Sequence, residues 1–400
     1  MESNYKIEKS KLYTLLIAAL ILAAPLGAFI HHSFGSKLSD IIIIILLSYF
    51  TFSIAIYTYQ KKQSIQITSL SICLFFIFFF AAISSILAQN LDIGMLIKRT
   101  CVFILIIGIC LHVDKLDTNI IFWTSALAII LVALFVFQQP VYFHESEYHF
   151  GSDSRRPRLW PFYEQSPHSS GYYIAGITAM FIFSQPSISN QFTRFLKLAL
   201  VLTALYLIFG FRSSQVYFTF LAFFIGYVLI IKSLPRLFKL TGFIAGFIAS
   251  LYIVIDKVMI DIALRGYFDF ARMGSGRVGT WIQRFEDFSM RGPFDIMLGS
   301  GAGTDISYIG LWWWKETTSH NSFLTYLIEF GILGFFLIIL YFIIIFKRFR
   351  IIIVPVLVAI IFSSLIGNGI ILRPTPLVFF TIASILSYRL ITIKDLHYSK

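Results

Sequence analysis

Long apolar runs alternate with short polar turns over almost the whole chain. A run of about 20 apolar residues is long enough to cross the hydrocarbon core of a bilayer as a helix. The pattern therefore predicts an all-α polytopic membrane protein with about 12 transmembrane helices. The predicted windows lie near residues 12–30, 40–59, 66–88, 94–112, 119–139, 170–185, 195–210, 214–231, 238–255, 322–346, 351–368 and 374–391.

Two longer polar segments, 138–169 and 256–321, interrupt this pattern. They divide the chain into a membrane domain at 1–255, which carries the first segment as a loop, a loop subdomain at 256–321, and a second membrane part at 322–400. The composition agrees with this prediction, since 58% of the residues are hydrophobic, only 13% are charged, and the mean hydropathy is +0.82. A soluble domain cannot bury that much apolar surface.

The formal net charge of +12 is explained by orientation in a membrane. Most Lys and Arg residues fall in the loops on one side, whereas the short loops on the other side contain only Lys37, Lys98, Arg99, Arg212 and Arg373. The positive-inside rule then places both termini in the cytoplasm and both long segments on the outer face. Nucleic acid is not an expected partner, because no basic face with interleaved aromatic residues remains.

His320 and Asn321 stand where the second long segment re-enters the membrane as an apolar run. A neutral imidazole can accept a proton from a sugar hydroxyl near neutral pH, which few other side chains can do. A histidine at a helix start can equally be a capping or interfacial residue. The residues alone leave both interpretations open, and Asn321 is a further candidate for substrate binding.

Two arginines at the outward surface are candidates for binding an anion. Arg212 lies in GFRSS between two predicted spans, and Arg277 opens a helix predicted at 277–289. An arginine at this boundary is costly unless it meets an anion or extends to the lipid headgroups. Arg277 can alternatively pair with Glu286 or Asp287. Two guanidinium groups on one diphosphate make chemical sense, because their planar donors match phosphate oxygens.

Further candidates for substrate binding lie in both long segments. Arg158 and Glu164 belong to the stretch RPRLWPFYEQSP, and Arg284 belongs to the predicted outward helix. Trp314 can stack on a sugar ring or anchor the loop at the membrane interface. The glycine-rich stretch 298–304 is either a turn that folds the loop back over the membrane or a phosphate cradle without the usual Lys-Ser/Thr ending.

Two patterns make specific structural predictions. Glu329 lies inside an apolar run, where an acid is a functional candidate unless it pairs with a neighbouring helix. Trp281 and Phe285 are four residues apart, which predicts that they share one face of the helix at 277–289.

The outward motifs together resemble the O-antigen ligase and O-antigen polymerase superfamily. The resemblance covers roughly residues 211–334 and is carried by GFRSS, SGRVGTW, PFDIMLGSGAGT and SHNSFLTYLIEFGILG. It implies a fold like that of type C glycosyltransferases and a metal-independent, inverting transfer without a cofactor. It further implies that Arg212 and Arg277 hold the donor diphosphate and that His320 deprotonates the acceptor hydroxyl. The chain has no Asp-x-Asp motif and no Rossmann fingerprint, which disfavours a nucleotide-sugar donor held through a metal.

The resemblance also implies the partners and the location. The donor would be an undecaprenyl-diphosphate-linked glycan on the periplasmic face of a bacterial inner membrane. In a polymerase the acceptor is the next lipid-linked repeat unit, and in a ligase it is lipid A-core. A polymerase is the favoured interpretation, with surrounding membrane lipids and a chain-length regulator as further partners. A glycolipid transporter is the alternative from another class, but transporters place polar groups near the midplane, whereas here the charges gather at one face.

Overall fold

The computed structural model describes most of the chain. The described residues are 2–30, 34–60, 65–88, 92–112, 116–140, 158–164, 166–231, 277–305, 319–367 and 369–398, with isolated positions at 241, 244, 255 and 259. The predicted window at 238–255 lies almost entirely outside them, as do most of the two long polar segments. Every element assigned in the described part is an α-helix or a 3-10 helix.

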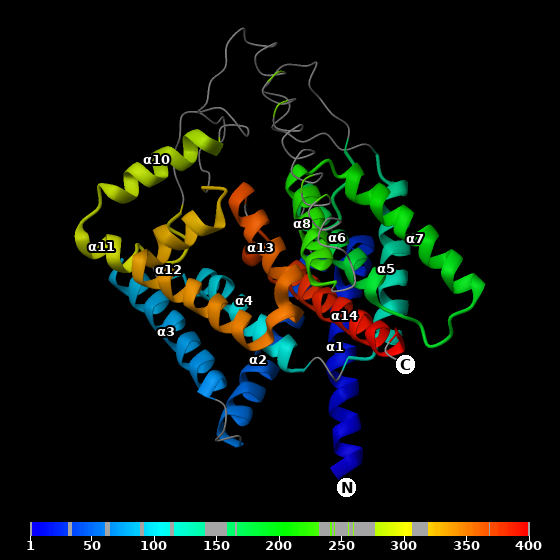
Figure 1. Ribbon diagram of the computed structural model, residues 1–400. Helices are drawn as coiled ribbons and strands as arrows, with labels where there is room; N and C mark the ends of the chain where they lie inside the picture. The colour runs from blue at the N-terminus through cyan, green and yellow to red at the C-terminus, as the bar shows by residue number, and fades with distance from the viewer. Residues whose placement is uncertain are drawn as a thin grey trace.

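Among the described residues, eight helices lie between residues 2 and 230 and seven helical elements lie between residues 277 and 398 (Figure 1). The first eight are α1 (Glu2–Ile30), α2 (Phe34–Gln60), α3 (Ile65–Leu87), α4 (Ile93–Leu111), α5 (Thr118–Gln138), α6 (Pro167–Phe183), α7 (Gln191–Gly210) and α8 (Ser214–Ile230). The others are α10 (Arg277–Ser289), α11 (Pro293–Leu298), α12 (Ser322–Phe349), η5 (Arg350–Ile353), α13 (Val354–Ile366), η6 (Ile370–Leu372) and α14 (Pro374–Tyr398).

Apolar length makes this a multi-pass membrane protein. Eight stretches of the described residues are long and apolar enough to cross a bilayer: Leu12–Ile30, Phe34–Ile56, Ser69–Leu87, Ile93–Leu111, Thr118–Gln138, Gln191–Gly210, Ser322–Leu365 and Pro374–Thr392. The Ser322–Leu365 stretch holds both α12 and α13, which meet at Arg350 and η5. Helices also occupy the predicted windows at 170–185 and 214–231, but they are only 17 residues long. The number of spans therefore stays a prediction.

The interior of the bundle is built around α6 and α14. All residues of α6 except His168 and Ile182 are buried, and α6 packs along α14. Gly176 allows this approach, since a Cβ there would lie 2.8 Å from the Phe379 side chain. Small residues serve this purpose at helix contacts in membranes, where close packing replaces the hydrophobic drive. Around this pair, α1 packs on α2 and α5, α3 on α12, and α8 on α13.

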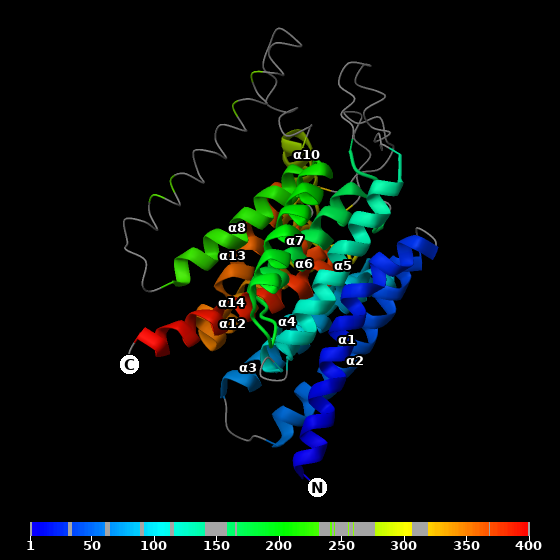
Figure 2. The same ribbon diagram turned by 90° about the vertical axis from the view of Figure 1, so that its right-hand side faces the viewer.

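The two ends of the bundle differ in content. Both labelled termini lie toward the lower end in Figure 1, and α10 lies toward the upper end in both views (Figures 1 and 2). The upper end also holds the start of α12, because Trp281 of α10 donates a hydrogen bond from Nε1 to the carbonyl of Ser319, three residues before α12, at 2.6 Å.

Candidate functional site

His320 sits in a strained turn at the start of α12. Its φ of 51° lies in the left-handed region, which is uncommon for a residue other than glycine. Asn321, the next residue, is the N-cap of α12, and its Oδ1 accepts the N–H groups of Phe323 and Leu324, both at 3.1 Å. This cap accounts for Asn321 structurally. The imidazole is half-buried and has contacts of its own.

Asp305 holds the residues on both sides of His320. Its Oδ2 accepts the Ser319 N–H at 3.1 Å, the Ser319 hydroxyl at 2.7 Å and the Thr325 hydroxyl at 2.6 Å. Its Oδ1 accepts Arg284 Nε at 3.2 Å and Nη2 at 3.1 Å. The carboxylate is buried, so these bonds are formed out of water and fix the turn firmly. No sequence pattern indicated this role for Asp305.

The inward face of α10 is formed by residues 281, 284 and 288. Arg284 and Phe288 are buried and Trp281 is half-buried, whereas Phe285 is 59% exposed. Trp281 and Phe285 lie four residues apart on one side of the helix, but only Trp281 packs inward, because the ion pair of Arg284 with Asp305 turns that part of the helix toward the bundle. The guanidinium of Arg284, a predicted substrate ligand, is occupied by Asp305 and by Asp287 at 3.7 Å.

Glu329 is paired inside the bundle. Arg99 of α4 donates to it through Nε at 2.9 Å and Nη2 at 3.1 Å, and the Gly303 N–H donates to Oε1 at 3.0 Å. Of the two interpretations of Glu329, the structure gives the pairing with a neighbouring helix. Arg99 was counted with the cations of the short loops although it falls inside the predicted window at 94–112, and the structure buries it within α4.

The glycine-rich turn is docked on a break in α12. Gly331 has φ 66° and ψ −174°, which is not helical and leaves carbonyls of the preceding turn without helical partners. Ser300 N–H donates to the Ile328 carbonyl at 3.1 Å, and Gly301 N–H donates to the Glu329 carbonyl at 2.9 Å. Such replacement is needed wherever a helix breaks at membrane depth.

The same contacts bear on the phosphate-cradle interpretation of residues 298–304. Gly301 N–H also donates to Ser84 Oγ at 2.8 Å, Ala302 N–H to Ser85 Oγ at 3.1 Å, and Gly303 N–H to Glu329. A cradle needs free N–H groups to bind an anion. These N–H groups are already used, so the stretch is the turn that folds the loop back, and it is fixed rather than flexible.

Arg212 and Arg158 lie together at the turn between α7 and α8. The Leu159 N–H donates to the Gly210 carbonyl at 3.0 Å, which docks the segment 158–164 beside Arg212. The positive charges of Arg212 and Arg158 both act on the Tyr217 hydroxyl. Arg212 is exposed, has φ 49°, and forms no ion pair with any carboxylate of the described residues. The structure thus concentrates positive charge at this turn.

Glu164 is tied to α6 and to the residue before α14. Its Oε2 accepts the Ser169 hydroxyl at 2.6 Å and Arg373 Nη1 at 3.3 Å. Arg373 also donates to Ser169 and lies over the Tyr172 ring, 5.3 Å from its centroid. Burial, and then the charge of Glu164, raise the pKa of the adjacent Tyr163 well above its usual value, so its phenol stays neutral. From the sequence, Arg373 contributes only to the charge bias that orients the chain in the membrane. In the structure it pairs with Glu164 of the segment 158–164, which also contains Arg158.

The segment 367–369 joins these two halves of the site. Gly369 N–H donates to Ser322 Oγ at 2.8 Å, at the first turn of α12. At Gly367, a Cβ would lie 2.4 Å from the Gln215 carboxamide, in the first turn of α8. His320 and Arg212, which precede these two helix starts, are therefore brought to the same end of the bundle on either side of one short segment.

Backbone strain marks the same residues. Four described residues other than glycine have positive φ, and three of them are the predicted site residues Glu164, Arg212 and His320. Such conformations cost about 1–3 kcal/mol each and persist where surrounding contacts impose them, often at functional sites. The fourth, Arg350, lies at the corner between α12 and α13.

Two predicted residues cannot be placed. Arg277 is the first residue of α10, but its side chain lies outside the described part, and Trp314 lies wholly outside it. Among the residues that the structure describes, no three His, Cys, Asp or Glu side chains form a group that could hold a metal ion.

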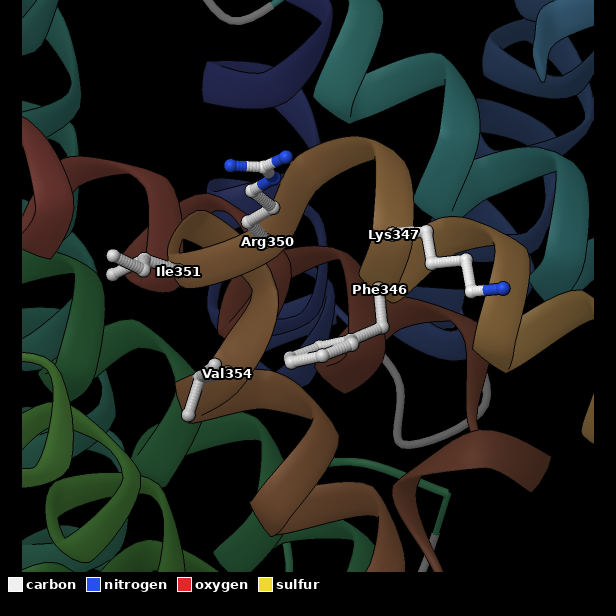
Figure 3. Close-up of a pocket in the computed structure, with 5 residues that line it drawn as sticks. All are labelled: Phe346, Lys347, Arg350, Ile351 and Val354. Atoms are coloured by element: carbon white, nitrogen blue, oxygen red, sulfur yellow. The ribbon is translucent and has the colours of Figure 1, made fainter.

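A cavity of about 460 Å³ lies at the corner of α12, η5 and α13, away from these residues (Figure 3). It is lined by Phe346, Lys347, Arg350, Ile351 and Val354. Figure 3 shows the Lys347 and Arg350 side chains pointing in different directions, so their charges do not converge on one ligand. It contains none of the predicted site residues.

Comparison with known proteins adds no family. No protein-family model matches the chain, and no curated protein matches it. The fold and its apolar helices define the class, which is a multi-pass α-helical membrane protein with a polar cluster at one end.

Proposed function

We propose that this protein is a surface-polysaccharide polymerase that transfers a glycan from a polyprenyl diphosphate to the next lipid-linked repeat unit. The observation that carries the proposal is the position of His320 and Arg212 at the same end of a membrane bundle, where Gly369 bonds to the helix that follows His320 and Gly367 contacts the helix that follows Arg212. Both have a strained backbone, and Arg212 has no described carboxylate partner. A base and an unneutralised cation are what transfer from a diphosphate requires.

In the proposed reaction, His320 takes the proton of the acceptor hydroxyl as that oxygen attacks the anomeric carbon. The bond from this carbon to the diphosphate oxygen breaks, with inversion, and the lipid diphosphate leaves as an anion. Arg212 and Arg277 stabilise the charge that develops on the leaving group. Arg158, whose charge acts near Arg212, extends this cationic surface toward the substrate. The reaction faces the periplasm of a bacterial inner membrane.

The base assignment is tested with a pair of substitutions at one position. His320→Asn removes the base but keeps a residue that tolerates the left-handed backbone, whereas His320→Ala removes both. We expect both variants to lose polymer synthesis, and His320→Asn to unfold at the wild-type temperature. Polymer is followed on gels of the cell-surface polysaccharide. Full activity of His320→Asn would show that the imidazole is not the base.

The acceptor is tested by deleting the gene. For a polymerase, we expect the polysaccharide ladder to collapse to a single repeat unit on its final carrier. A ligase would instead leave the carrier bare while lipid-linked polymer accumulates. An unchanged pattern of every surface glycan, including capsule and exopolysaccharide, would contradict both reactions.

A further inference from the structure

The helices α10 and α11 carry an apolar surface that the described residues leave uncovered. Ile282 and Phe285 are three residues apart on α10 and are 45% and 59% exposed, and Phe294 and Met297 repeat this spacing on α11 at 59% and 41%. Residues three and four apart share one side of a helix. On α10, Gln283 and Asp287 lie on another flank, and the exposed Glu286 and Ser289, four residues after Ile282 and Phe285, border the apolar pair. Each helix thus exposes two apolar side chains on one side, which together are called the stripe below.

The contacts of the glycine-rich turn fix the depth of α11. Ser300 and Gly301, directly after α11, bond to the carbonyls of Ile328 and Glu329. Glu329 is seven residues into α12, and at 1.5 Å per residue this is about 10 Å below the helix start at Ser322. Because α12 begins a stretch apolar enough to cross the bilayer, α11 lies at the depth of the membrane boundary, not above it.

The neighbouring surface is already suited to lipid. The helix α11 packs on α3 and α12, and Figure 1 shows α10 and α11 along one edge of the bundle beside these helices. The outward end of α3 exposes Ile86 and Leu87, and α12 exposes Ile332 just after its break. The apolar stripe of α10 and α11 therefore continues the lipid-facing surface of two membrane helices.

We propose that α10 and α11 form an interfacial element whose stripe, Ile282, Phe285, Phe294 and Met297, contacts the lipids of the outer leaflet. Helices with one apolar and one polar side lie in the membrane interface in this way. The segment predicted as a loop subdomain above the membrane is then partly seated in it. This inference does not rest on the proposed enzymatic reaction.

The test places a fluorescent label on each side of α10. Phe285→Cys and Phe294→Cys are labelled through the thiol in a protein whose buried Cys73, Cys101 and Cys110 are replaced by Ala, with Asp287→Cys as the control. The proteins are placed in phosphatidylglycerol–phosphatidylethanolamine nanodiscs. We expect nitroxide-bearing lipid to quench the labels at 285 and 294 more than aqueous iodide does, and iodide to quench the label at 287 more.

Two other results would overturn the inference. Stronger quenching by iodide at all three positions would put the stripe in water, and protection from both quenchers at 285 and 294 would mean that a second copy of the chain covers it. The unmodified protein gives an independent reading, because a diazirine-bearing phospholipid should crosslink to peptides from 282–297. Absence of that crosslink, with α12 peptides labelled in the same sample, would also contradict lipid contact.

Discussion

The two halves of the polar end differ in whether their arginines form ion pairs with carboxylates. Around α12, each buried guanidinium meets a buried carboxylate, Arg99 with Glu329 and Arg284 with Asp305. Around α6 to α8, Arg373 meets Glu164 at 3.3 Å, but Arg212 is exposed and pairs with no carboxylate of the described residues. The buried arginine charges of the first half are neutralised by carboxylates of the protein. In the second half, the charge of Arg212 has no counter-charge among the described residues.

This difference separates structural charges from candidate ligand-binding charges. A buried ion pair adds little net stability, but removing one partner leaves the other charge uncompensated. An exposed arginine without a partner adds almost nothing to folding, so its presence at this boundary is better explained by an anion. The comparison therefore predicts large stability effects in the α12 half and large activity effects in the α7–α8 half.

The largest effect is expected from breaking the pair of Arg99 and Glu329. Glu329→Leu leaves Arg99 buried without its carboxylate, which should cost about 3–5 kcal/mol of folding free energy. The double variant Arg99→Met/Glu329→Leu should recover much of this loss. The free energy of unfolding of the wild type, the single variant and the double variant is measured in mixed detergent micelles. If the double variant is no more stable than the single one, the pair is not the structural unit described.

A smaller effect is expected at the break in α12. A Cβ at Gly331 would lie 2.4 Å from the Met297 carbonyl oxygen, and its φ of 66° is strained for any other residue. Gly331→Ala should therefore cost about 2–3 kcal/mol. Gly292→Ala is the matched control, because nothing lies within 4 Å of a Cβ there and its φ is −61°. An equal fall in the thermal unfolding temperature of both variants would contradict the docking of the turn.

The smallest change in stability and the sharpest change in activity are expected at Arg212. Arg212→Gln should stay within about 0.5 kcal/mol of the wild type, since the side chain is exposed and forms no ion pair with the described residues. Polymer synthesis should nevertheless fall strongly, because the developing charge of the leaving group loses its cation. Lys98→Gln, at an exposed cation within α4, should keep activity. Equal activity of both variants would remove Arg212 from the site.

Much of the fold follows from the sequence because apolar length leaves few alternatives. A run of about 20 apolar residues in a bilayer has to form a helix, so helix positions could be predicted closely. The start of α12 was also predicted, since the apolar window was placed from residue 322, but the capping role of Asn321 was not predicted. The same reasoning identified His320 and Arg212 as boundary residues.

The pairings could not be predicted, because they join distant parts of the chain. Arg99 and Glu329 are 230 residues apart, and Asp305 meets Thr325 only through the fold of the outward segment. One signal was available, since Arg99 and Glu329 each fall within a predicted apolar window where a charge needs a partner. The burial of Arg284 could not be predicted either, because Arg284 looks like a surface residue until Asp305 is placed beside it.

The break in α12 also has a consequence for how the chain assembles in the membrane. The helix α12 cannot adopt its bend until the turn at 299–303 and the end of α3 are in place, because they donate hydrogen bonds to the carbonyls of Ile328 and Glu329. The turn is made before α12, so each depends on the other to reach its final position. Biogenesis of the last third of the protein is thus coupled to the folding of its outer segment, and a defect there would be seen first as a failure to complete insertion.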